Sequence, residues 1–425
     1  MGVRSKIWTK SLGMMAVSST LALSAGAGWA ADLTVWCWDP NFNGSTMEKA
    51  FAIYQASHPE DTLTIEYFDK TALEQKMQTQ LAAGVTDGLP DIVLVGDEMA
   101  QKFLLAFPGA FEPLTDELDY AAMAPNKVAV ATVDGETYSM PFDSGVTGYF
   151  YRSDILGEAG YTAADLEDIT WDRLIEIGQD VLQKTGKQLL PIDTNDAGPL
   201  LMMMQSAGGW YFDAEGNPTI KDNAALRATL ETYARLVNSG IVKPVNGWPE
   251  YTGSFTSGET LSTYIGVWIT GTIKANADQA GKWAVAPIPR LDGVPGAVNA
   301  SNLGGSSWYV FADAPNKDDA IDFLKTVWGA DIDFYQQILV ENGAVGSLMT
   351  ARDGEAYQAV DDFFGGQPVW QNFSTWLSEI PPINFGIYTQ EANAALVGQL
   401  PALLAGGDVD EIIDAIDAQV QAQIQ

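Results

Sequence analysis

Beyond residue 30 the chain alternates short apolar runs with longer stretches in which apolar residues recur every three or four positions. Leu33–Trp38, Leu63–Phe68 and Asp91–Val95 have the length and pattern of strands. Between them, Ser45–Glu48 and Thr71–Glu74 carry the S/T-x-x-E pattern of a helix start, a capping box. This order of elements predicts parallel strands in an α/β sheet.

The remainder of the chain continues the alternation, with more helices than strands. A strand over Thr263–Trp268 leads into a helix over Thr270–Ala277. Further helix starts are predicted at Thr170, Asn223, Asn316 and Asp408. A chain of 425 residues exceeds what one core usually serves, so we expect two domains. Because no flexible linker separates them, we expect strand-like crossings between the domains.

The first 30 residues have the pattern of a cleaved secretory leader. Arg4, Lys6 and Lys10 form a basic segment, and an apolar stretch follows over Leu12–Leu23. Small residues in Gly28–Ala30 favour cleavage before residue 31, with cleavage after residue 27 as the alternative. We therefore expect a signal peptide over 1–30 and an exported, soluble product in a periplasm.

Charge and rare residues narrow the function classes. The chain has 55 acidic and 22 basic residues, a net charge of −33, and loss of 1–30 with its three cations would give −36. Such a surface repels phosphate backbones, so no nucleic-acid partner is expected. The single His58 and single Cys37 argue against a disulfide, a metal site or a cofactor. Cys37 follows Trp36 rather than a small residue, so no lipid anchor is expected.

Candidate binding residues follow the predicted strands. Ligands of open α/β sheets gather at the carboxyl ends of strands. Trp38 and Asp39 follow the first strand, Asp69 the second and Asp97 the third, and Trp268 ends the later one. Each acid alone is equally typical of a helix cap and each Trp of a core residue, but their convergence favours a ligand site.

Tryptophan is abundant, and its positions form two groups. Four lie on periodic apolar faces and are assigned to the core: Trp36, Trp171, Trp283 and Trp328. Five lie beside Gly, Pro, Asp or Asn in predicted loops or at strand ends: Trp38, Trp210, Trp248, Trp268 and Trp370. The C–H faces of a sugar ring stack on such aromatics, and nearby polar groups hold its hydroxyls. No phosphate-binding loop, nucleophile elbow or calcium loop is present, so no catalytic residue is proposed.

Several motifs in order resemble the family 1 extracellular solute-binding proteins, the maltose-binding-protein-like sugar receptors of ABC importers. They are Leu89–Val93, Tyr138–Asp143 with Tyr149–Asp154, Phe255–Glu259 before the strand ending in Trp268, and Asn302–Ser306. The resemblance covers nearly all of the chain beyond residue 30. It implies two α/β lobes, each a sandwich around a mixed, mostly parallel sheet, joined by three hinge crossings near Asp143–Gly148, Leu303–Ser306 and Gly343–Leu348. The N-terminal lobe would be 31–143 and 304–343, and the C-terminal lobe 144–303 and 344–425.

The resemblance also implies a set of sugar contacts. They are Trp38, Asp39, Asp69, Asp97, Asp143, Asn195, Asp196, Trp210, Trp248, Trp268, Gly304, Ser306, Trp370 and Tyr388. The chain departs from the maltose receptor at the third strand, where Val95-Gly96 replaces an aromatic, which argues against maltose more than against a sugar.

The function expected is that of a monomeric receptor that captures a neutral mono- or oligosaccharide between its lobes and delivers it to the transmembrane permease of an ABC importer. Two alternatives stay open. Trp walls with carboxylates also bind ammonium groups, so a polyamine or other cation receptor is one. A secreted carbohydrate-active enzyme, which needs only two carboxylates, is the other.

Overall fold

The three predicted parallel strands form the centre of one lobe in the computed structural model, which describes residues 30–213 and 216–424. β1 (Asp32–Cys37) pairs in parallel with β2 (Thr62–Tyr67) on one side and β3 (Ile92–Gly96) on the other. The helices of this first lobe are α1 (Ser45–Gln55), α2 (Lys70–Ala82), α3 (Asp97–Ala106), α4 (Pro125–Val130), α11 (Lys317–Val327) and α12 (Ile332–Asn342). The expected signal peptide falls, except for Ala30, outside the described residues.

The faces of β1 explain why helices cover both sides of this sheet. Leu33 and Val35 face a core shared with α1, α11 and α12, whereas Trp36 faces a second core shared with α2 and α3. Successive strand residues point to opposite faces, so a strand with buried apolar residues on both faces must be covered on both sides. A hairpin of β4 (Thr132–Val133) and β5 (Glu136–Thr137) completes the lobe.

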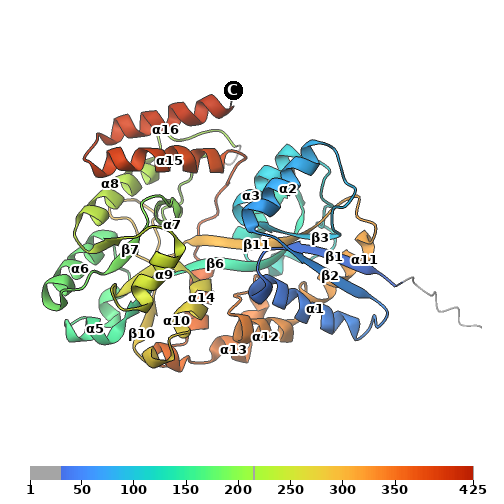
Figure 1. Cartoon of the computed structure of the whole chain (residues 1–425), viewed down its shortest axis with the longest axis horizontal. Helices are drawn as coiled ribbons and strands as arrows, with labels where there is room; N and C mark the ends of the chain where they lie inside the picture. The colour runs from blue at the N-terminus through green and yellow to red at the C-terminus, as the bar shows by residue number, and fades with distance from the viewer. Residues whose placement is uncertain (1–29, 214–215, 425) are drawn as a thin grey trace, which may run out of the picture.

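The second lobe, on the left in Figure 1, is richer in helices. Its strands are β7 (Leu190–Ile192), β8 (Val242–Pro244), β9 (Ser262–Gly266) and β10 (Trp283–Ala286). Its helices are α5 (Ser153–Glu158), α6 (Trp171–Thr185), α7 (Gly198–Ser206), α8 (Ala224–Asn238), α9 (Trp248–Thr256), α10 (Thr270–Lys274), α14 (Val369–Leu377), α15 (Thr389–Leu404) and α16 (Val409–Ile424). A short α13 (Glu355–Gln358) links α12 to α14. No helix in the described part of the chain is both long and apolar enough to cross a bilayer.

Two long strands run through both lobes, as Figure 1 shows. The first half of β6 (Ser139–Arg152) pairs with β11 (Asn302–Val310), and its second half pairs with β9 and β10. A third segment crosses at the same level, because Ser144 N–H donates to the Val345 carbonyl at 3.0 Å and Ser347 N–H to the Phe142 carbonyl at 3.0 Å. The three segments expected to connect the lobes therefore lie side by side.

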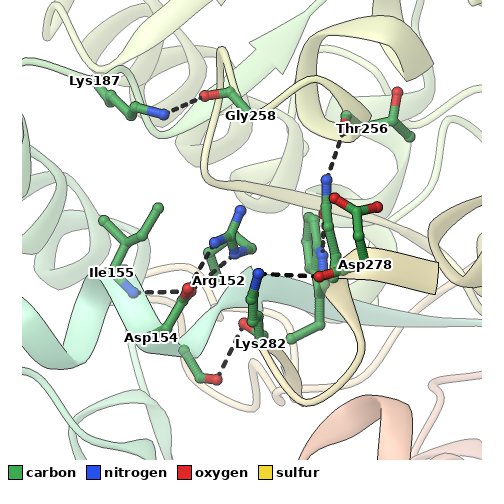
Figure 2. A network of polar contacts seen from close by, with 11 residues as sticks. Arg152, Asp154, Ile155, Lys187, Thr256, Gly258, Asp278 and Lys282 are labelled. Atoms are coloured by element: carbon green, nitrogen blue, oxygen red, sulfur yellow. Dashed lines mark hydrogen bonds and ion pairs between the residues drawn. The ribbon is translucent and has the colours of Figure 1, made fainter. Parts of the chain in front are cut away.

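A polar network holds the far end of β6 in the second lobe (Figure 2). Arg152 donates to both carboxylate oxygens of Asp154, at 2.8 and 2.6 Å, and Lys187 donates to the Gly258 carbonyl at 2.7 Å. Lys282 donates to the Asp278 carbonyl at 3.0 Å. The Arg152–Asp154 pair fixes the start of α5 at the end of β6, and Ser153 N–H donates to the Lys282 carbonyl at 3.0 Å, which joins this end to the loop before β10.

The sheet composition differs from the expected mostly parallel arrangement. Only β1–β2, β1–β3 and β7–β8 pair in parallel among the described strands. Every pairing of β6 and β11 is antiparallel, because these strands cross between the lobes rather than returning over a helix.

Local helix starts also differ in two places. Asp39, not Ser45, caps the first helical segment, a π-helical turn over Pro40–Gly44 that continues into α1. Asp69, not Thr71, caps α2 by accepting from Ala72 N–H at 3.1 Å. The predicted caps Thr170 and Asn223 are confirmed, as each accepts a hydrogen bond from the first turn of its helix.

Candidate functional site

Trp268 is held in place by a hydrogen bond to a crossing strand. β9 ends at Gly266, and Trp268 lies in the following 3-10 turn, Val267–Ile269. Its Nε1–H donates to the Leu303 carbonyl oxygen at 3.1 Å, which joins it to the crossing strand β11. A Cβ on Gly266 would lie 2.2 Å from this Nε1, so only glycine leaves room for the indole.

Trp248 and Tyr251 extend the aromatic surface. Trp248 begins α9 and is 48% exposed. Its ring stacks on Tyr251 with centroids 5.5 Å apart and an interplanar angle of 14°. It lies 5.7 Å from the Trp268 ring at 49°. Three neighbouring rings thus offer apolar faces to a ligand that also needs polar partners.

Two hollows flank these rings. The Trp268 hollow has a volume of about 320 Å³ and is also lined by Trp210 and Gly304. The Trp248 hollow has a volume of about 240 Å³ and includes Tyr251. Asp196 and Leu303 line both hollows, so the two are adjacent compartments of one site.

Asp196 is the polar group shared by the two compartments. Asp196 as a whole residue is exposed to solvent. Its carboxylate, however, lies in the lining of the Trp268 hollow, where protein atoms surround it. One oxygen accepts from Gly198 N–H at 2.9 Å. Loss of hydration raises the pKa of Asp196, and the charge of Asp193 adds to the rise. An accessible carboxylate in such surroundings is a strong acceptor for hydroxyl groups.

Helix α15 supplies polar residues that the sequence analysis missed. Thr389, Gln390 and Asn393 line the Trp268 hollow, and Trp210 Nε1–H donates to Thr389 Oγ1 at 3.2 Å. Asn393 Oδ1 accepts from the Tyr211 hydroxyl at 3.0 Å, which directs its amide nitrogen to other partners. A sequence signal existed: the polar residues of this otherwise apolar helix are concentrated in its first turns.

Three expected contacts, Asp97, Asp143 and Ser306, form a buried cluster against Gly305. Lys127 Nζ donates to both carboxylate oxygens of Asp97, at 2.5 and 2.6 Å, and to the Ser306 carbonyl at 2.9 Å. Ser306 Oγ donates to Asp143 at 2.5 Å. Burial raises the pKa of Asp97 to about 7 although Lys127 opposes the rise, and burial likewise raises that of Asp143. These polar groups face protein partners and hold α3 against the crossing strands.

Three more candidates lie in the first lobe, outside the lining of both hollows. The Asp39 carboxylate accepts from two backbone N–H groups of the turn that it caps, and Asp69 caps α2. Trp38 is half-buried, with Lys70 Nζ 5.8 Å from its ring centroid.

The last three candidates are dispersed in the second lobe. Asn195 is exposed and donates to the Asp193 carboxylate at 3.2 Å. Tyr388 precedes α15 and is half-buried. Trp370, expected in a loop, lies in α14, is 8% exposed and belongs to the apolar core.

The chain belongs to the bacterial extracellular solute-binding proteins, whose family model matches residues 49–346. It is 52% identical to a lactose-binding protein of Rhizobium radiobacter over 410 residues, which is 96% of this chain and 97% of that protein. It is also 26% identical to an arabinooligosaccharide-binding protein of Bacillus subtilis over 72% of this chain and 71% of that one.

Solved structures share the two-lobe fold. The GacH receptor of Streptomyces glaucescens superposes with a TM-score of 0.76 at 18% identity, over 93% of this chain and 98% of that one. The galacto-N-biose-/lacto-N-biose I-binding protein of the ABC transporter from Bifidobacterium longum gives 0.75 at 20% identity, over 93% and 97%. These neighbours confirm the expected two-lobe α/β fold class, in which the sheet is mixed rather than mostly parallel.

Proposed function

We propose that this chain is the sugar-binding component of an ABC transporter and that its ligand is lactose or a closely related disaccharide. The observation that carries the proposal is the fixed Trp268 ring beside the accessible Asp196 carboxylate. Stacking faces next to a hydroxyl acceptor suit a neutral sugar. The lactose-binding relative, similar over almost its whole length, supports the choice of sugar.

Binding is proposed to work by population shift between open and closed arrangements of the lobes. The lobes are taken as 31–143 with 304–343 and 144–303 with 344–425, hinged where β6, β11 and the segment 343–348 run together. A sugar that contacts both lobes favours the closed arrangement, which presents the surface that a membrane permease recognises. The protein acts as a monomer in the periplasm after loss of 1–30, carries no lipid anchor and leaves its ligand chemically unchanged.

The distribution of carboxylates favours a neutral ligand over a polyamine. Of the carboxylates that line the Trp268 hollow, Glu98 is already paired with Lys70. In the adjoining Trp248 hollow, both carboxylate oxygens of Asp193 accept hydrogen bonds, from Asn195 N–H at 2.9 Å and from Gly247 N–H at 2.7 Å. Asp196 is thus left as the open carboxylate of the site, whereas a cation with several ammonium groups needs more than one. A glycosidase would need two carboxyl groups as its acid and its base or nucleophile. Because Glu98 is paired with Lys70, it is poorly suited to be one of them.

Calorimetric titration tests the proposal. The protein lacking 1–30 is titrated with lactose, galactose, maltose, mannitol and spermidine. We expect lactose to bind more tightly than the others and thin-layer chromatography to recover it intact. Tighter binding of spermidine than of every sugar, or release of galactose from lactose, would contradict the proposal.

A further inference from the structure

We propose that Lys102 and Glu391 are positioning residues that set the width of the Trp268 hollow by joining the two lobes. Lys102 Nζ lies 3.1 Å from Glu391 Oε1. Lys102 is on α3 of the first lobe, and Glu391 is in the first turn of α15 of the second. A second contact joins the same helices, in which Gln390 Nε2 lies 3.7 Å from Met99 Sδ. The inference rests on the proposed function, because the hollow is the sugar site.

The ion pair lies directly beside residues of the site. Glu98, one helical turn before Lys102, lines the Trp268 hollow from the first lobe. Gln390, next to Glu391, lines it from the second. Any change in the separation of α3 and α15 therefore changes the separation of these two lining residues.

Helix α3 is held firmly at its start, which makes the position of Lys102 dependent on the hinge. Asp97, the first residue of α3, is bound by Lys127, and Lys127 also binds the Ser306 carbonyl of β11. β11 is irregular there, with a register shift between Asn302 and Gly305. Movement at this crossing is thus transmitted along α3 to Lys102.

The Lys102–Glu391 ion pair is partly buried, which strengthens the attraction between the two charges. The side chains of Lys102 and Glu391 are 20% and 29% exposed, so salt screens them less than a surface pair. Oε2 of Glu391 is buried and accepts from no described side chain. Loss of Lys102 would leave this partly buried carboxylate without its cation, which disfavours the arrangement with α3 close to α15. Apparent sugar affinity then falls with the fraction of molecules in that arrangement.

Charge reversal on the protein lacking 1–30 tests the proposal. Lys102→Glu and Glu391→Lys each place like charges opposite one another on α3 and α15, and the double variant restores an ion pair. We expect each single variant to bind lactose about tenfold more weakly, equivalent to 1.4 kcal/mol, and the double variant to recover most of the affinity. Lys317→Glu is the matched control, since Lys317 and Glu112 lie 3.0 Å apart at 30% and 28% exposure within the first lobe.

Small-angle scattering without sugar supplies a readout that does not depend on the ligand. We expect a larger radius of gyration for both single variants and a wild-type value for the double variant and the control. Unchanged affinity and radius of gyration in the single variants would overturn the proposal, as would failure of the double variant to recover either. Absence of lactose binding to the wild-type protein would contradict the proposed function instead, and the scattering comparison would still decide the role of the ion pair.

Discussion

Replacement of Trp268 by alanine is the most direct perturbation of the site. It removes the ring that lines the Trp268 hollow, together with the hydrogen bond to the Leu303 carbonyl. A stacked aromatic contact is worth about 1–3 kcal/mol. Since 1.4 kcal/mol is a factor of ten, lactose affinity should fall by roughly ten- to a hundredfold.

The effect on folding should be smaller than for a core residue. Trp268 is only partly buried, and the hydrogen bond that it makes contributes about 1 kcal/mol. A fully buried tryptophan replaced by alanine costs about 3–5 kcal/mol. Trp268→Ala should therefore weaken binding strongly while lowering the free energy of unfolding by about 1–2 kcal/mol.

Calorimetry with lactose and urea unfolding without it separate the two effects. Trp268→Phe is the matched control, because it keeps an aromatic face but loses the indole N–H, and it should bind between wild type and Trp268→Ala. A loss of several kcal/mol in unfolding free energy with unchanged affinity would refute the assignment of Trp268 to the sugar site.

Four further outcomes are expected. Gly266→Ala should displace the indole, whose Nε1 a Cβ would approach to 2.2 Å, and weaken lactose binding in calorimetry with less effect on unfolding. Trp370→Ala should lower the unfolding free energy by about 3–5 kcal/mol in urea titrations, with affinity kept wherever the variant is folded. The pKa of Asp97 is raised to about 7 in the folded state, so its contribution to stability is complete below about pH 4 and is lost as the pH rises through 7. In Asp97→Asn, the free energy of unfolding should therefore change less between about pH 4 and pH 7 than in the wild type. Lactose affinity should change less than tenfold between low and high salt, since stacking is not screened; a larger loss would favour a cationic ligand.

Much of the fold could be predicted from single residues that typically begin or end a helix. Thr170 and Asn223 precede amphipathic stretches, and Gly186 follows the first of them with a left-handed φ of 73°. The helix starts at Asp39 and Asp69 were mispredicted because Ser45 and Thr71 offered equally good caps further along the chain. Local sequence does not decide between neighbouring caps when tertiary packing fixes where the strand must end.

The site was predictable where aromatic residues stood beside chain breakers, and less so elsewhere. Trp248 follows a glycine with a left-handed φ of 74°, which places it at the start of a helix and in the open. Gln390 and Asn393 come from a helix far along the chain, and only the packing of α15 brings them to Trp268. Asp97 has a protein partner that the sequence did not indicate. Its place after a strand suggested a ligand contact, but Lys127, thirty residues on, occupies its carboxylate.

The two lobes contribute unequally to the site, which bears on the order of events in binding. The second lobe supplies Trp248, Trp268, Asp196 and the polar start of α15, whereas the first lobe supplies Glu98 from α3. Under the proposed function, we expect a sugar to make its stacking contacts and its bond to Asp196 with the second lobe alone. Approach of α3 then adds Glu98, and the Lys102–Glu391 pair favours this arrangement of the lobes. On this basis stacking residues govern the initial affinity, and the contacts of α3 govern how far closure follows.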